Sequence, residues 1–317
     1  MINVKAYNVK GDGITDDTLA IQTLLDAYPS VYFPEGTYRI TRSIVLTNTP
    51  ITLLGDSPKT LFFCDFTEIQ PGIIFRPDKH SIPGHNIGNF CISGQNIEVG
   101  ILLDVSDPLT HIYKLDLHHV FTYGLNCSIS LLNPIGRDGF FTSTIKNCWL
   151  DGGIQLERCG DSVSIHQNTI TGNGDGILLS NVEGAAQCVI SENNITTKKH
   201  AIILGEHVAQ LTVSKNQCEK NHDDPIETEY MIIITGTSTG KASANRILEN
   251  NLNDFNYTTY GAIGLHNADD TSIISNYITR VGRHVYISPT CSNTLIEHNY
   301  KTDSLQIEDN GLDTRIQ

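Results

Sequence analysis

The sequence predicts an all-β fold, a single-stranded right-handed parallel β-helix (a solenoid), and three observations support this prediction. An asparagine flanked by apolar residues recurs along the chain. After a short turn, each asparagine is followed by a second apolar run, such as 153–156 or 176–179. These runs are short, rich in β-branched residues and bounded by Gly, Asn and Asp, which is typical of strands. Short strands repeated at a similar period, with no helices between them, indicate the coils of a β-helix.

The recurring asparagines are expected to be structural. Strands of successive coils stack about 4.8 Å apart, so residues at one register position lie above one another. An asparagine in a tight bend can adopt the left-handed conformation and hydrogen-bond to its neighbours. We therefore expect a ladder of stacked asparagines between inward apolar positions, formed by Asn147, Asn168, Asn193, Asn216, Asn250, Asn276 and Asn299.

One interval between these asparagines is too long for a plain coil. The successive spacings are 21, 25, 23, 34, 26 and 23 residues. The long interval predicts an insertion near 219–240, and residues 133–140 predict a smaller protrusion. Because the coils themselves are occupied with stacking, functional residues on a solenoid tend to gather on such loops.

Composition excludes several classes of protein. The chain has 317 residues, with 35 acidic against 21 basic side chains and a net charge of −14. That balance opposes binding to nucleic acid phosphates or to an anionic membrane surface. No apolar run is long enough to span a membrane, and the first residues lack the pattern of a Sec signal peptide. The eight cysteines are widely spaced, so buried reduced thiols are expected, with no metal and no other cofactor.

The first sixty residues predict a cap on the solenoid. Acidic residues within 12–17 precede an amphipathic helix, and Thr15 or Asp16 is placed to cap its start. A helix at this end would cover the unpaired strand edge of the first coil. The segment 31–40 then predicts a strand, a turn and a strand. We expect one domain, with a cap over 1–60 and coils over 61–317.

Two motifs in this region resemble a known superfamily. Residues 11–18 read Gly-Asp-Gly-Ile-Thr-Asp-Asp-Thr, and residues 32–38 read Tyr-Phe-Pro-Glu-Gly-Thr-Tyr. With the Ala-Ile-Gln helix between them, they closely resemble the start of the pectate-lyase-like right-handed parallel β-helix superfamily. Within it they look most like the phage tailspike and polysaccharide depolymerase branch. The acidic residues of the motifs belong to the cap, so we expect them to be structural.

This resemblance implies a substrate class and a setting. The substrate would be a bacterial surface polysaccharide, either capsule or O-antigen. The protein would be a homotrimer held by an anchor protein on the virion tail, located on the virion or outside the cell after host lysis. The resemblance supplies no catalytic residues, because members of the superfamily differ in where their carboxylates lie.

The first candidate active site is a pair of carboxylates. Glu157 and Glu206 are expected two coils apart, about 9–10 Å along the axis, with Glu206 one position further along its strand. That spacing is close to the separation of the acid and the base in an inverting glycosidase. Asp175 would be a third carboxylate nearby. Arg158, the next residue after Glu157, would either pair with it or bind substrate.

The second candidate active site is a column of turn residues. Asp175, His200 and Tyr230 fall on adjacent coils, and Arg283 lies further along the same column. A lyase acting on a uronic acid needs a base for the C5 proton, an acid for the leaving oxygen and a cation for the carboxylate. His, Tyr and Arg, or the adjacent Lys199, match these roles.

Other residues are candidate sugar contacts. His266 and Tyr286 occupy outward positions near the second column. In the insertion, Asp223 would bind substrate, and Asp224 would supply an acid from a neighbouring subunit of a trimer; a solvated acidic loop is the alternative. Trp149, the single tryptophan, is assigned to an inward core position.

Together these features favour a phage-type depolymerase that binds and cleaves a surface polysaccharide. Hydrolysis by paired carboxylates is preferred modestly, because the sequence offers more placed acids than bases. The alternatives are a lyase that acts by β-elimination and a non-catalytic glycan-binding adhesin or tail protein. A pectin-type enzyme ranks after these.

Overall fold

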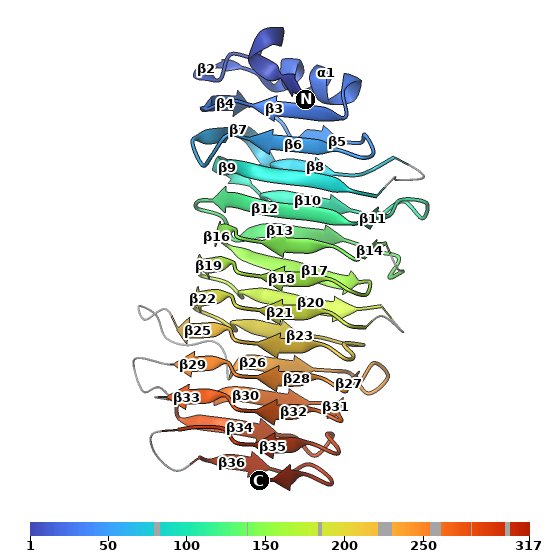
Figure 1. Ribbon diagram of the computed structural model, residues 1–317, viewed down its shortest axis with the longest axis vertical. Helices are drawn as coiled ribbons and strands as arrows, with labels where there is room; N and C mark the ends of the chain where they lie inside the picture. Colours follow the sequence, from blue (N-terminus) through green and yellow to red (C-terminus); the bar gives the residue numbers. More distant parts are fainter. Residues whose placement is uncertain are drawn as a thin grey trace.

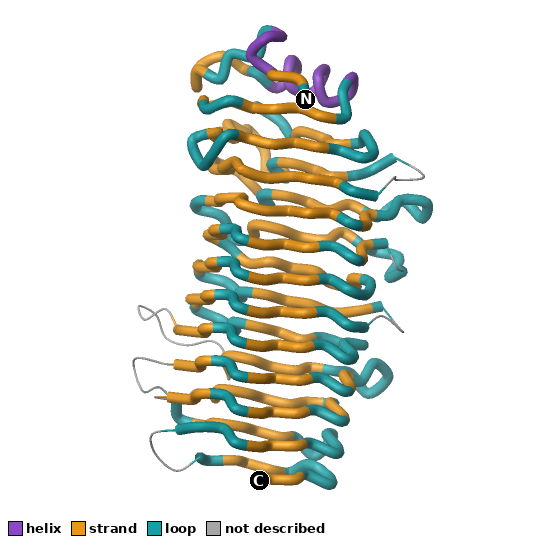
Figure 2. Tube along the Cα trace, in the orientation of Figure 1, coloured by secondary structure: helices purple, strands orange, loops and turns teal. Residues whose placement is uncertain are grey.

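The protein is an elongated parallel β-solenoid, with the N-terminal helix at one end and the C-terminus at the other (Figure 1). The computed structural model describes residues 1–78, 83–137, 139–182, 186–220, 230–253, 261–279, 281–301 and 305–317. Strands of each coil lie over those of the coil before, and turns project at the corners (Figure 2). The predicted fold class is confirmed: over the described ranges α1 (Thr18–Ala27) is the one α-helix, and none of their helices is long and apolar enough to cross a membrane.

One wall of the solenoid is an 11-stranded parallel sheet that contains the second apolar run of every coil. The predicted stacking of these runs is confirmed, because Ile154 pairs with Ile177, Ile177 with Ile202, and Ile202 with Ile232. The strands are β5 (Ile44–Leu46), β8 (Ile73–Phe75), β10 (Ile101–Asp104), β13 (Cys127–Leu132), β17 (Gly153–Cys159), β20 (Ile177–Asn181), β23 (Ile202–Leu204), β26 (Tyr230–Thr235), β30 (Gly261–His266), β34 (Arg283–Ile287) and β36 (Ile307–Asp309).

The other walls are formed by a 22-stranded sheet that bends once in each coil. Before the bend lie β1 (Ile2–Asn3), β3 (Ser30–Phe33), β6 (Thr52–Gly55), β15 (Thr144–Lys146), β18 (Ser164–His166), β21 (Val189–Ser191), β24 (Thr212–Ser214), β28 (Arg246–Leu248), β32 (Ser272–Ile274), β35 (Leu295–Glu297) and β37 (Arg315–Ile316). After it lie β2 (Asp12–Asp16), β4 (Gly36–Ile40), β7 (Thr60–Gln70), β16 (Trp149–Asp151), β19 (Thr169–Gly172), β22 (Asn194–Thr197), β25 (Gln217–Lys220), β29 (Asn251–Asn253) and β33 (Tyr277–Thr279). Two long strands, β9 (His85–Ile97) and β12 (Leu115–Thr122), pair on both sides of the bend.

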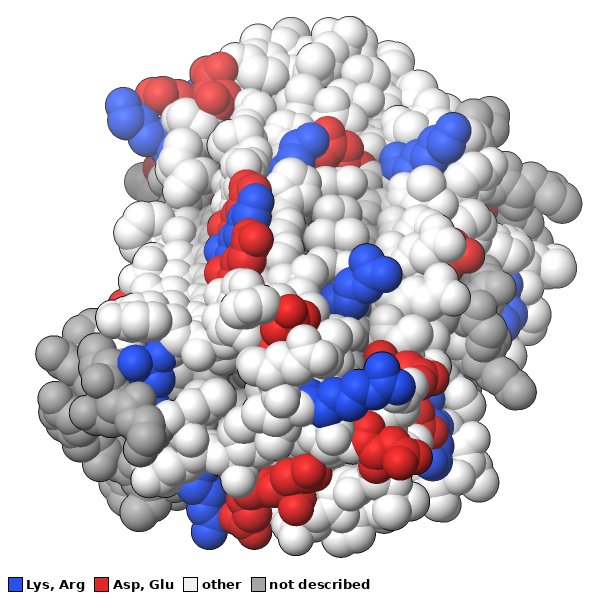
Figure 3. Space-filling model, turned by 60° about the horizontal axis from the view of Figure 1, so that its bottom comes forward, with Lys and Arg blue, Asp and Glu red and all other residues white. Residues whose placement is uncertain are grey.

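Two small sheets lie in the turns. β11 (Ile112–Tyr113) pairs with β14 (Phe140–Phe141), and β27 (Ala242–Ser243) pairs with β31 (Ala268–Asp269). Inside the solenoid, stacked Ile, Leu, Val and Phe side chains form one continuous core, and all eight cysteines are buried thiols as expected. On the face drawn in Figure 3, acidic and basic side chains lie in short groups separated by wide uncharged areas.

The bend is held by a buried asparagine ladder, which confirms the structural prediction. The side-chain amide of each asparagine donates to the side-chain oxygen of the next at 2.9–3.0 Å, from Asn168 through Asn193, Asn216, Asn250 and Asn276 to Asn299. The backbone N–H of each donates to the same oxygen.

Two details of the ladder differ from the expectation. The left-handed residue is the one before the asparagine, such as Gln167 (φ 57°) or Lys215 (φ 57°). In the first coil of the series Asn147 takes this left-handed position (φ 53°), and Cys148 occupies the ladder position, where its N–H donates to Asn168. Since a one-residue shift moves every side chain of a strand to the opposite face, this correction changes the assignment of the strand that follows.

The N-terminal cap covers the first coil. Helix α1 buries Ile21, Leu24 and Leu25, and a one-turn 3₁₀ helix (Val4–Tyr7) buries Val4. The Asp16 carboxylate accepts the N–H of Thr18, while buried Asp17 accepts the N–H groups of Lys10 and Gly11. These carboxylates are therefore used in holding the cap together, as the sequence predicted, but the N-cap residue of α1 is Asp17 and not Thr15 or Asp16.

We predict that Asn216→Ala lowers the free energy of unfolding by about 2–4 kcal/mol, because it leaves ladder donors and acceptors unpaired in a buried place. Asn194→Ala, which removes an exposed amide directly after the ladder residue of the preceding coil, should change stability by less than about 0.5 kcal/mol. Urea unfolding followed by circular dichroism measures both. Equal effects in the two variants would contradict the structural role of the ladder.

Candidate functional site

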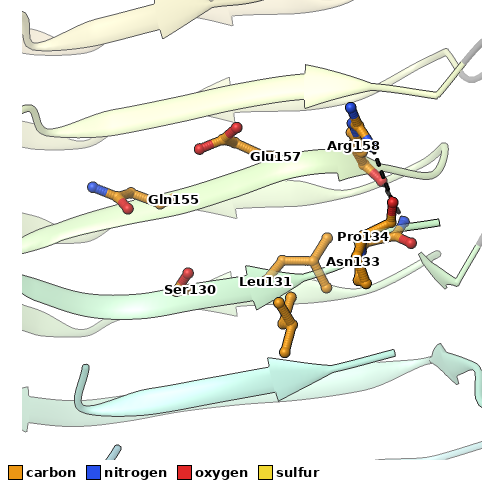
Figure 4. Close-up of a pocket in the computed structure, with 8 residues that line it drawn as sticks. Ser130, Leu131, Asn133, Pro134, Gln155, Glu157 and Arg158 are labelled. Atoms are coloured by element: carbon orange, nitrogen blue, oxygen red, sulfur yellow. Dashed lines mark hydrogen bonds between the residues drawn. The ribbon is translucent and has the colours of Figure 1, made fainter. Parts of the chain in front are cut away.

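The outer face of the 11-stranded sheet contains a surface pocket of about 280 Å³. Its floor is made by outward residues of β13 and β17, and one side is the 133–137 loop. The pocket is lined by Ser130, Leu131, Leu132, Asn133, Pro134, Gln155, Glu157 and Arg158 (Figure 4). Hydroxyl, amide, carboxylate and guanidinium groups thus converge in a shallow space that suits a sugar.

Arg158 holds the loop that borders this pocket. Its Nη1 donates to the Pro134 carbonyl at 3.1 Å, and its own carbonyl accepts from Asn133 Nδ2 at 2.7 Å (Figure 4). Arg158 is left-handed (φ 57°), and the pairing of β17 with β20 shifts register between Leu156 and Cys159. The bulge leaves Glu157 and Arg158 exposed side by side, as bulges do where a side chain is re-aimed.

Glu206 does not line the pocket that contains Glu157. It lies in the turn after β23, where it is half-buried and its carbonyl accepts the N–H of Asn181. The bulge after Leu156 breaks the simple alternation that the sequence argument assumed. The two carboxylates are therefore not brought to one described pocket, and the pairing of Glu157 with Glu206 stays a prediction.

Asp175 and His200 form a dyad, the contact that the turn column predicted. His200 Nδ1 lies 3.0 Å from Asp175 Oδ1, and the backbone N–H of His200 donates to the same oxygen at 3.0 Å. Their side chains are 25% and 19% exposed respectively. A carboxylate at Nδ1 favours the tautomer with the proton on that nitrogen, which leaves the lone pair of Nε2 as an acceptor.

The surroundings keep Asp175 ionised. Partial burial by itself raises the pKa of Asp175, but the hydrogen bonds and charge of His200, together with the charge of Lys199, lower the pKa below 3.8. A positive charge therefore acts on the dyad from the same turn. An oriented imidazole beside a stable carboxylate is the arrangement of a general base.

Tyr230 is the first residue of β26, the strand of the next coil, but its ring packs toward the later coils. It lies over Gly264 and stacks against Tyr286, with ring centroids 6.0 Å apart. The residue is 1% exposed. The structure therefore places Tyr230 in an aromatic cluster with His266 and Tyr286, and not as an exposed acid beside His200.

The remaining predicted contacts are distributed along the solenoid. His266 and Tyr286 have centroids 5.3 Å apart and are partly exposed, so they offer ring surface for a sugar. Arg283 is in register with Gly261 and Tyr230, and its Nη1 lies 4.0 Å from Glu308. Asp223 and Asp224 lie outside the described residues.

Trp149 was assigned to the core, and this was wrong. Its side chain is 50% exposed, whereas Leu150 is fully buried. The error follows from counting strand positions from Asn147, when the ladder position is Cys148. A shift of one residue exchanges the two faces of β16. Alignment of Leu150 with the inward Ile170 would have shown this from the sequence.

We predict that Gly264→Ala lowers stability by about 1–3 kcal/mol. A Cβ at this position would lie 2.6 Å from Tyr230 Cδ2, so the ring would have to leave its place against Tyr286. Gly174→Ala is the control, because its Cβ would meet nothing closer than 3.8 Å. Thermal unfolding compares the two, and a neutral Gly264→Ala would contradict the tight packing of the cluster.

We predict a contribution of Asp175 to acid sensitivity. Because its folded pKa is lowered, its stabilisation is present above the unfolded value of 3.8 and is lost as the pH falls through the folded pKa. Asp175→Asn should therefore be less stable than the wild type near neutral pH, with the difference shrinking below about pH 4. Unfolding free energies measured across this range test it. A constant difference between the two curves would show that the lowered pKa does not contribute.

Two family models match separate parts of the chain. Residues 1–114 match the model described as rhamnogalacturonase A/epimerase, pectate lyase-like, and residues 126–259 match the model of the periplasmic copper-binding protein NosD. Within the described ranges no three His, Cys, Asp or Glu side chains come together as a metal site, so the residues seen do not fit a copper centre. The second match includes the part of the asparagine ladder from Asn168 to Asn250.

Curated relatives and solved structures extend the comparison. The pre-neck appendage protein of Bacillus phage phi29 is 30% identical over 102 residues, which are 31% of this chain and 12% of that protein. The Dettilon tailspike protein has a TM-score of 0.67 at 13% identity, covering 98% of this chain and 68% of the other. The A-module of a mannuronan C-5 epimerase of Azotobacter vinelandii has a TM-score of 0.60 at 14% identity, covering 100% and 97%.

The similarity to these solved structures establishes the fold. The pectate-lyase-like family model matches the cap and the first coils in sequence as well. The chain spans about an eighth of the length of the phage appendage proteins that it matches. Residues 1–114 therefore resemble the pectate-lyase-like family, and the chain shares the β-helix fold of the tailspike and the epimerase.

Proposed function

We propose that this chain is the glycan-processing β-helix of a phage tail protein and that it binds and cleaves a bacterial surface polysaccharide. The polymer lies on the outer face of the 11-stranded sheet, and the reaction is a β-elimination at a uronic acid residue. The observation that supports this most directly is the Asp175–His200 dyad. The similarity to a phage appendage protein and to a tailspike supports the phage setting.

In the proposed reaction His200 is the base. Nε2 takes the C5 proton of the uronate, while Asp175 holds the ring and stabilises the imidazolium that forms. The C4–O bond then breaks as the C4–C5 double bond forms, and the proton on Nε2 passes to the departing oxygen. The positive charge of Lys199 faces the substrate carboxylate and favours the removal of the C5 proton. Atoms and charge balance without a cofactor.

Hydrolysis at Glu157 is the second candidate function. It is favoured by one specific observation, the pocket in which Glu157 lies among the polar side chains of Ser130, Gln155 and Arg158. In this reaction Glu157 would protonate the leaving oxygen or activate water. Its expected partner Glu206 lies outside that pocket, and for this reason we rank hydrolysis after elimination. Homotrimer assembly and a tail anchor protein remain part of the proposal.

We predict that purified capsular and O-antigen polysaccharides include one that the protein cuts, with new reducing ends and the ultraviolet absorbance of unsaturated uronates. His200→Ala should lower kcat by about 10²–10⁴-fold, because the general base is removed. Asp175→Asn should lower it as well and change the pH profile of kcat. The matched control is His298→Asn, since His298 also contacts a carboxylate, Glu297 at 3.0 Å, but lies exposed on the other sheet.

Each other outcome assigns a different function. Reducing ends without that absorbance, lost in Glu157→Gln, would overturn elimination in favour of hydrolysis. Equal losses in His200→Ala and His298→Asn would remove the dyad from the mechanism. A polysaccharide that binds and is not cut would leave an adhesin, a function named for the structurally similar surface protein PfbA of Streptococcus pneumoniae, which has a TM-score of 0.57 at 17% identity.

A further inference from the structure

A column of outward side chains follows the bend on the 22-stranded sheet, whereas the dyad lies in the turns that lead from this wall to the 11-stranded sheet. These residues start the short strands after the ladder and pair directly with one another from coil to coil. We call them the outer column, formed by Trp149, Thr169, Asn194, Gln217, Asn251 and Tyr277. Tyr300 continues the column by a bridge to Tyr277.

The outer column is uncharged over its whole length, although 18% of the chain is charged. Its middle consists of exposed amides. Within the described part of the chain the side-chain amides of Asn194 and Asn251 are exposed and make no hydrogen bond, whereas Gln217 Nε2 donates to Glu219 Oε1 at 2.6 Å and the buried ladder asparagines saturate one another. Neutral donors and acceptors in a row suit the hydroxyl groups of a sugar chain.

Exposed aromatic rings stand at both ends of the outer column. Trp149 is 50% exposed at one end, and Tyr277 and Tyr300 are 41% and 58% exposed at the other. The two tyrosine rings are stacked, with centroids 5.0 Å apart and an angle of 11° between their planes. Stacking covers one face of each ring and orders both, so little side-chain entropy is lost when a sugar packs against the ring surface that stays exposed.

The length of the outer column sets the length of its ligand. Five coil steps of about 4.8 Å separate Trp149 from Tyr277, or roughly 24 Å. The ligand that fits is therefore an extended, regular polymer with flat apolar faces and many hydroxyl groups. A protein partner would need a contiguous apolar centre in its interface, and the middle of the column is polar.

We propose that the outer column is a second glycan-binding site, which holds an uncut stretch of polysaccharide along the solenoid axis, apart from the wall where cleavage takes place. The proposal rests on the proposed function for the class of polymer only, and needs no catalytic step. A second site of this kind keeps the protein on its polymer between cleavage events, because the two sites act as a multivalent pair.

The single tryptophan of the chain makes the test direct, because all tryptophan emission comes from the outer column. Size-fractionated capsular and O-antigen polysaccharides are titrated into the His200→Ala variant, which is expected not to cut them. We expect one polymer to shift the Trp149 emission and to protect it from acrylamide. Fragments that span the column should bind more tightly than short ones.

Substitutions identify which rings bind. Trp149→Ala and Tyr277→Ala should each weaken binding of long fragments by about three- to tenfold, measured by calorimetry. For short fragments the double variant should lose no more affinity than the more affected single variant, because one short fragment cannot reach both rings. Tyr7→Ala is the matched control, since Tyr7 is similarly exposed, at 45%, but lies in the cap.

The outcomes separate this proposal from the function proposed above. Cleavage of a polymer by the wild type without any change in Trp149 emission would overturn the second site and leave the enzyme. Binding that depends on Trp149, with no polymer cut, would support the second site and overturn the enzyme. Trp149 emission could change with protein concentration in the absence of polymer, and Trp149→Ala could change the mass of the particle in solution. Together these results would show that the outer column is a contact between copies of the chain, and would overturn the proposal. So would a panel in which no polymer alters the emission.

Discussion

The structure depends on one constraint, that every coil must offer the same group at the same place as the coil before. The asparagine ladder shows why. Each buried amide donates to the next asparagine and accepts from the previous one, so no member is satisfied without both neighbours. Leaving a buried amide without partners costs more free energy than a single hydrogen bond contributes to stability. The ladder therefore holds the period and the direction of the bend through the coils from Cys148 to Asn299.

The same constraint leaves little freedom for function. Inward positions must stay apolar because they stack on identical positions, so variation is confined to outward positions, bulges and turns. The features that carry the proposals lie in such places: the bulge at Glu157 and Arg158, the adjacent turns that contain Asp175 and His200, and the outward starts of the strands after the ladder. The aromatic cluster of Tyr230 and Tyr286 requires glycine at position 264 for the same reason. Any side chain there would occupy the space that the Tyr230 ring fills.

Two walls of the solenoid then acquire different characters. The 11-stranded sheet presents charged and titratable groups in a pocket and at a turn, where a carboxylate orients an imidazole. On the wall after the bend, the outer column presents neutral amides between aromatic rings. A long polymer can lie along either wall, because both are straight over many coils (Figure 1). Chemistry and retention are thus proposed for separate surfaces of one solenoid.

The sequence by itself determined the fold class, the cap, the stacked register of the 11-stranded sheet and the ladder from Asn168 to Asn299, because periodic apolar positions and repeated asparagines are local patterns that stacking forces on every coil. It also placed Asp175 next to His200, since both fall at the same turn position of adjacent coils. Only the tertiary structure decided that Glu206 lies outside the pocket of Glu157, that Tyr230 is buried against Gly264, and that Trp149 is exposed. Bulges, ring orientations and a one-residue shift at Cys148 depend on contacts between coils, and no periodic count along a single coil contains them.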